Sequence, residues 1–282
     1  MKKRIYIILS MITALYLLTG CSGAGGSEAA SGELTFKQAL ERPGVHVWYD
    51  VNSLSDGRFA KVRAAFVFED GKVIVYDTGD INDKIPDALG TLEDYYSLSE
   101  EDAAALVREK YRSGYEAYYA LLEDRLNKFR EDTKDYAGYP NPEEQEQALV
   151  ETYETLTAEP LPEKEPQVYG FAMTADQSGN KTAAEGFHAF VMQDDTYSGM
   201  IGSSASGYEL YKIQEGQAIE KYFPAQETLR NVQIYDTWYG GYNADYHELF
   251  GNGSLHYLVT KCNEDTVFLL DEPGTEGIEI IG

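Results

Sequence analysis

The clearest fold signal in this chain is the stretch Ala64-Ala65-Phe66-Val67-Phe68-Glu69-Asp70-Gly71-Lys72-Val73-Ile74-Val75-Tyr76. Two apolar runs, rich in β-branched and aromatic residues, flank an acidic turn that ends in Asp70-Gly71. An Asp-Gly pair readily adopts the positive φ angles that a tight turn between two strands requires. The stretch therefore predicts a β-hairpin, and the other elements can be placed on either side of it.

Strand-like runs lie before and after this hairpin. Thr35 and Gln38 have the spacing of a helix capping box, so a short helix through Leu40 is expected, followed by a strand at 45–49. The later runs that predict strands are 167–173, 187–192, 208–213, 232–235, 255–262 and 267–270.

Between the two groups of strands the apolar spacing becomes helical. Ser99 precedes three acidic residues that suit the positive end of a helix. Apolar residues then recur at steps of three and four: Val107, Tyr111, Tyr115, Tyr118, Leu122, Leu126 and Phe129. Asn141-Pro142 is a typical start for a second, shorter helix. We therefore expect an antiparallel helical pair at 99–158, with its aromatic stripe as a packing surface.

The segregation of strand runs from helix runs predicts an α+β fold, with antiparallel β-sheet segments flanking an inserted antiparallel helical pair. The portions are 33–98 (N-terminal β portion), 99–158 (helical pair) and 159–282 (C-terminal β portion, opened by a proline-rich linker). Residues 33–282 are enough for one large domain or two smaller ones. The pattern leaves open whether the β portions share one sheet.

The N-terminus has the features of an export signal. Lys2, Lys3 and Arg4 precede an apolar run at 5–18, which is shorter than the roughly 20 residues of a permanent membrane helix. The run ends in Leu18-Thr19-Gly20-Cys21, which resembles the lipobox of bacterial lipoproteins. Together with the small polar residues that follow, this leader resembles those of surface lipoproteins of Gram-positive bacteria.

The resemblance implies that residues 1–20 are a signal peptide, cleaved before Cys21, and that Cys21 carries a thioether-linked diacylglycerol and an acylated N-terminus. Two or three acyl chains anchor a protein stably. Residues 21–32 are rich in glycine, serine and alanine, which predicts a flexible tether. We expect a lipid-anchored protein on the extracytoplasmic face of the cell membrane. An uncleaved signal anchor is the alternative, and in a Gram-negative source either membrane could hold the lipid.

Charge narrows the range of partners. The net charge is −25, and loss of the leader's three basic residues makes it −28. A chain this acidic is repelled by nucleic acid and by anionic lipid surfaces, so we expect no nucleic-acid partner and membrane contact only through the lipid on Cys21. The second of the two cysteines, Cys262, then has no intramolecular disulfide partner and is expected to be a small buried residue.

Known catalytic motifs are incomplete in this sequence. The stretch 202–206 ends in serine where a nucleophile elbow has glycine, and the histidines lack the spacing of a zinc site. The acidic loop 77–83 lacks EF-hand spacing, so a solvated loop is favoured over a calcium site. A pairing of Cys262 with His247 or His256 as base has no supporting geometry. We therefore assign no catalytic residue, no metal and no cofactor.

The most distinctive stretch for ligand binding is 235–247, in which aromatic residues alternate with Asp, Asn and Gly. Aromatic faces beside short polar groups suit a sugar or peptide groove, but packing over a sheet end is favoured over binding in a chain this rich in tyrosine. If the stretch binds a ligand, the residues expected to do so are Trp238, Tyr239, Tyr242, Asn243 and Tyr246.

Three functions fit the sequence. The leading hypothesis is a non-catalytic, lipid-anchored binding or envelope-associated module whose partner is a glycan, a peptide or an envelope protein. The second is a cell-surface hydrolase that uses carboxylates, which geometry alone could identify among 48 acidic residues. The third is an interaction protein that docks a partner through the helical pair. It requires the apolar stripe of the first helix to be exposed.

Overall fold

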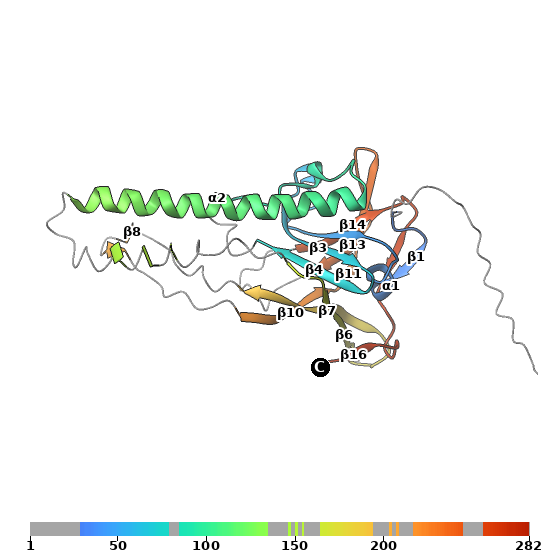
Figure 1. Cartoon of the computed structure of the whole chain (residues 1–282). Helices are drawn as coiled ribbons and strands as arrows, with labels where there is room; N and C mark the ends of the chain where they lie inside the picture. The colour runs from blue at the N-terminus through green and yellow to red at the C-terminus, as the bar shows by residue number, and fades with distance from the viewer. Residues whose placement is uncertain are drawn as a thin grey trace, which may run out of the picture.

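The computed structural model describes residues 29–78, 85–134, 146–147, 150–151, 154, 164–193, 203–204, 207–208, 217–244 and 256–281. These residues form a layered α+β structure of mostly antiparallel sheets with one long helix. Figure 1 shows helix α2 along one side of a central sheet and the strands β6, β7, β10 and β16 on the opposite side.

The central sheet has the order β11-β13-β14-β2-β3-β4-β5, with β12 beside β13, and all its pairings are antiparallel. The expected hairpin is confirmed as β3–β4, and Asp70 and Gly71 have φ angles of 48° and 72° in its turn. The strands are β2 (His46–Val51), β3 (Val62–Glu69), β4 (Lys72–Asp77), β5 (Gln167–Val168), β11 (Glu227–Thr228), β12 (Val232–Ile234), β13 (Thr237–Ala244) and β14 (His256–Cys262).

One face of this sheet is covered by α2 (Glu100–Lys134) and the short 3₁₀ helix η2 (Leu92–Asp94), and a second 3₁₀ helix, η1 (Gly57–Phe59), lies beside η2. Ser99 caps α2, because its Oγ accepts a hydrogen bond of 3.0 Å from the backbone N–H of Asp102. The predicted stripe is buried where it is described; these residues are Val107, Tyr111, Tyr115, Tyr118 and Leu126. The side chains of Leu122 and Phe129 lie outside the described residues.

The other face packs against the second sheet, in the order β10-β7-β6-β16, where β16 is parallel to β6 and the other pairings are antiparallel. Helix α1 and the parallel pair β1–β15 complete this layer. The elements are β6 (Gly170–Ala175), β7 (Thr182–Gln193), β10 (Gln217–Ala225), β16 (Ile278–Ile280), α1 (Phe36–Leu40), β1 (Glu33–Thr35) and β15 (Val267–Leu269). The capping box expected for α1 is present, with Thr35 and Gln38 bonded reciprocally.

The structure answers two questions that the sequence left open. The N-terminal and C-terminal β portions share the central sheet, because β2 pairs with β14. The tether predicted for residues 21–32 ends earlier than expected. Ala30 is buried and forms a β-bridge with Cys262, and its carbonyl accepts a hydrogen bond of 2.8 Å from the N–H of Asn263.

Other predictions differ in detail. The expected strand at 167–173 is broken at Tyr169, so that β5 joins the central sheet and β6 joins the second sheet. Tyr169 packs against Phe68, Phe171 and Phe187 at this crossing. Most of the second predicted helix lies outside the described residues, and so does the run 208–213 apart from Tyr208. Tyr208 ends β9 (Gly207–Tyr208), which pairs with β8 (Ser203–Ser204). Within the described residues, no helix has the length and apolar run needed to cross a membrane.

Phe187 tests the packing between the sheets. Its ring contacts Phe36, Phe66 and Phe223, and the side chain is fully buried. We expect Phe187→Ala to lower the free energy of unfolding by about 3–5 kcal/mol, because it removes contacts and leaves a cavity.

The matched control is Phe190→Ala on the same strand, where the ring is 49% exposed. We expect the control to change stability by about 0.5 kcal/mol or less. Urea denaturation followed by fluorescence measures both variants. Equal losses for the two would contradict this packing.

Candidate functional site

An exposed aromatic surface lies at the turn between β12 and β13. Ile234 pairs with Thr237, so Tyr235 and Asp236 form a two-residue turn. Tyr235 has a φ of +56°, which is uncommon for a bulky residue. A backbone in this region persists only where its surroundings hold it, and it is found more often at functional sites.

Three neighbouring side chains, those of Arg58, Glu93 and Tyr96, hold Tyr235 in place. Its hydroxyl accepts a hydrogen bond from Arg58 and donates one of 2.7 Å to Glu93 Oε1, and that bond raises the pKa of Tyr235. The ring centroid lies 4.6 Å from that of Tyr96. The guanidinium carbon of Arg58 lies 5.4 Å from the centroid of Tyr235 and 4.5 Å from that of Phe59. We call Arg58, Phe59, Glu93, Tyr96 and Tyr235 the Tyr235 platform.

The platform is preformed and open to solvent. Phe59 is 55% exposed and Tyr235 is 48% exposed, although most large apolar side chains in the described chain fill two cores. The hydroxyl of Tyr235 is satisfied within the platform, so ring faces and charged groups remain for a partner. Rigid aromatic surfaces flanked by charge are typical of binding sites, because little side-chain entropy is lost when they bind.

The four described residues that the sequence singled out do not form one surface. They lie on β13, where alternate side chains point to opposite faces of the sheet. Trp238 and Tyr242 pack toward the second sheet, whereas Tyr239 packs toward α2 and Asn243 follows it on the same face. Tyr239 and Tyr242 are buried. Tyr246 lies outside the described residues.

The glycines of β13 have a structural explanation. A Cβ on Gly241 would lie 2.1 Å from the carbonyl oxygen of Leu258, and one on Gly240 would lie 2.6 Å from the ring of Phe268. The space that these glycines leave is therefore filled by the backbone of β14 and by side chains of Asn231 and Phe268 of the same chain.

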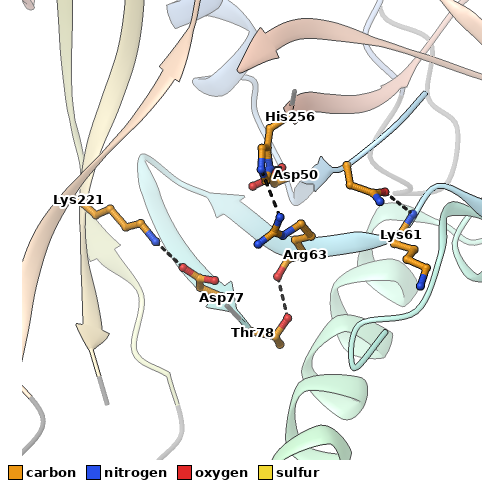
Figure 2. A network of polar contacts seen from close by, with 8 residues as sticks. Asp50, Lys61, Arg63, Asp77, Thr78, Lys221 and His256 are labelled. Atoms are coloured by element: carbon orange, nitrogen blue, oxygen red, sulfur yellow. Dashed lines mark hydrogen bonds and ion pairs between the residues drawn. The ribbon is translucent and has the colours of Figure 1, made fainter. Parts of the chain in front are cut away.

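A second candidate is the polar network at one end of the space between the sheets (Figure 2). His256 Nδ1 lies 2.9 Å from Asp50 Oδ1, and His256 Nε2 lies 3.3 Å from Arg63 Nη1. A β-bulge opposite Asp50 and Val51 accommodates Arg63 as the extra residue on β3. Nearby, Lys221 on β10 forms an ion pair of 2.7 Å with Asp77 on β4, which links the two sheets.

The Asp50–His256 pair has the orientation of a catalytic base, but its outer nitrogen meets an arginine. With Nδ1–H donated to Asp50, Nε2 is an acceptor and faces the Arg63 guanidinium, which does not release a proton in proteins. This geometry places the Asp50 carboxylate and the Arg63 guanidinium on either side of the His256 ring, and it does not activate a nucleophile. Cys262 offers no alternative, because burial raises the pKa of its thiol to about 12.

Two buried acids form a third candidate. Glu185 on β7 is 1% exposed and Asp271 is 3% exposed. Both oxygens of Glu185 accept from the backbone N–H of Asp271, at 3.2 and 3.1 Å, and Asp271 Oδ2 accepts from the N–H of Lys37 at 2.8 Å. Burial, together with the carboxylate of Asp271, raises the pKa of Glu185 to about 8. Buried in this way, the pair attaches the C-terminal segment to α1 and β7.

Sequence reasoning missed the platform because its members are distant in the chain. The one local signal was Tyr235-Asp236 between two strand-like runs, which a two-residue hairpin turn would explain. Arg58 and Phe59 precede β3, and no sequence motif marks them. We found no family model that matches the chain, and no match among curated proteins or solved structures.

Glu185 gives a pH-dependent prediction. The folded-state pKa of Glu185 is above the ordinary value of 4.5. The contribution of protonated Glu185 to the free energy of unfolding is therefore complete below about pH 4.5 and is lost as the pH rises toward 8. We expect the free energy of unfolding to fall between pH 6.5 and 8, by up to about 1.4 kcal/mol per pH unit. Glu185→Gln, which mimics the protonated acid, should remove this slope.

Glu185 and His46 lose their contributions to stability in different pH ranges. Burial and the nearby Arg42 lower the pKa of His46 to about 4, so its contribution is lost only as the pH falls below 6.5. Urea denaturation at pH 6.5, 7.2 and 8 measures the slope, with the exposed Glu220→Gln on β10 as control. A slope that persists in Glu185→Gln would contradict the assignment.

Proposed function

We propose that this chain is a lipid-anchored, extracytoplasmic, non-catalytic binding module that recognises an envelope-associated partner through the Tyr235 platform. The observation that carries the proposal is a pair of aromatic rings, Phe59 and Tyr235, held half-exposed by an arginine and a glutamate. The positive φ of Tyr235 belongs to the two-residue turn between β12 and β13, which places Tyr235 at the tip of the hairpin.

The lipobox sequence supports the anchored location. Cys21 lies outside the described residues, and the folded body begins near Ala30. Eight residues separate the two, and at about 3.3–3.6 Å per residue they span at most about 30 Å. A module anchored on Cys21 therefore works close to the membrane and presents its platform to partners within the envelope.

We infer that the inserted helical pair covers one face of the central sheet. Lys164 lies 5.2 Å from the ring of Tyr111, so the chain returns beside α2 after leaving its C-terminal end. The described residues between 146 and 154 are helical. The burial of Tyr111 and Tyr118 removes the main support for docking a partner through this stripe.

The hydrolase alternative has weaker support than binding. Its two converging acids, Glu185 and Asp271, are buried and bind backbone N–H groups. General acid–base chemistry requires groups within reach of a substrate.

The lipid anchor gives a direct prediction. In the native host, the wild-type chain should be found in the membrane fraction, and its N-terminal peptide should carry the mass of a diacylglycerol on Cys21. Cys21→Ser should release the chain from the membrane fraction or leave the leader uncleaved. A wild-type chain without lipid would contradict the anchoring.

The platform gives the test of binding. We expect the full chain in detergent to cosediment with isolated cell-envelope material, and Tyr235→Ala and Phe59→Ala to weaken this binding about 10- to 30-fold, as for central aromatic residues of interfaces. The stability of both variants should stay close to wild type, because the rings are half-exposed.

Phe190→Ala is the control, because it removes an equally exposed aromatic ring on the second sheet. If wild type does not bind, or if Phe190→Ala weakens binding as much as Tyr235→Ala does, the proposal is wrong.

A further inference from the structure

The Tyr235 platform already holds a guanidinium. Arg58 contacts the rings of Phe59 and Tyr235, donates to the Tyr235 hydroxyl, and forms an ion pair of 3.7 Å with Glu93. Planar guanidinium groups stack on aromatic faces and bind carboxylates, and lysine reproduces neither geometry well. The platform therefore contains every component of an arginine-binding site, and a side chain of the same chain occupies it.

The ion pair between the internal occupant, Arg58, and Glu93 is weak. The side chains of Arg58 and Glu93 are 45% and 39% exposed, and exposed ion pairs contribute little because water screens them. A competing guanidinium supplied by a partner would meet the same rings and the same carboxylate.

The surrounding charge favours a cationic partner. Asp56 and Asp236 flank the platform in sequence and are exposed, and neither forms an ion pair within the described residues. The chain as a whole carries a net charge of −25, which attracts basic segments over distance.

We propose that the partner of the platform is a basic protein segment, and that one arginine of this segment replaces Arg58 between Phe59 and Tyr235. This inference rests on the proposed function of the platform. Arg58 then acts as an internal competitor that sets the affinity. A partner of this kind would bind through a guanidinium and be rejected when lysine stands in its place.

The test uses the full chain in detergent and two probes, a Gly-flanked tetra-arginine peptide and its tetralysine counterpart, with binding measured by calorimetry. Wild type should bind the arginine peptide weakly. Arg58→Gln should bind it about tenfold more tightly because the competitor is gone, and Tyr235→Ala combined with Arg58→Gln should lose this gain. The tetralysine peptide should gain threefold or less.

Lys61→Gln is the matched control. It removes the same charge from the exposed Lys61, which pairs with Asp87 and, among the described cation–ring contacts, has none with the platform. An equal gain in Lys61→Gln would show a net-charge effect and overturn the inference. So would an equal gain for tetralysine, or no detectable binding by any variant.

The outcomes separate this inference from the proposed function. If Tyr235→Ala weakens envelope binding while Arg58→Gln gains no arginine affinity, the platform binds another partner, such as a glycan, and only the arginine assignment fails. If Tyr235→Ala changes neither measurement, both fail.

Discussion

The fold depends on a central sheet that is buried on both faces. All six residues of β2 are buried, and so are six of the eight residues of β3. Such strands have no solvated side, so each face of the sheet must be covered by an apolar layer. α2 and η2 cover one face, while the second sheet and α1 cover the other. The aromatic packing around Tyr111 and around Phe187 follows from this requirement.

The same requirement restricts where a partner can bind. Since both faces of the central sheet are covered, turns and sheet ends are left for recognition. The Asp50–His256–Arg63 network closes one end with matched charges, and the Lys221–Asp77 pair joins the sheets there. The turn at Tyr235 differs, because its rings face solvent while its polar atoms are satisfied. We therefore propose that recognition takes place at this turn, while the covered strands stabilise the fold.

The sequence predicted the features that depend on residues close together in the chain, and it did not predict those that depend on distant segments. The hairpin at Asp70-Gly71, the capping box at Thr35 and the stripe on α2 are local patterns, and all three are present. The pairing of β2 with β14 and the break at Tyr169 depend on contacts between distant segments, which no local pattern encodes. The composition of 235–247 fitted either a binding surface or packing over a sheet end. Strand alternation divides the aromatic residues of β13 between two cores and leaves Tyr235 at the tip of the turn.

Hydrogen–deuterium exchange of the full chain, with and without an arginine-rich peptide at saturating concentration, tests most directly whether recognition takes place at the platform. The account predicts slower exchange in the segments that contain η1 and the β12–β13 turn, with no change around Asp50 and His256. Protection confined to the Asp50–His256 end of the sheets, or no protection in any segment, would contradict it.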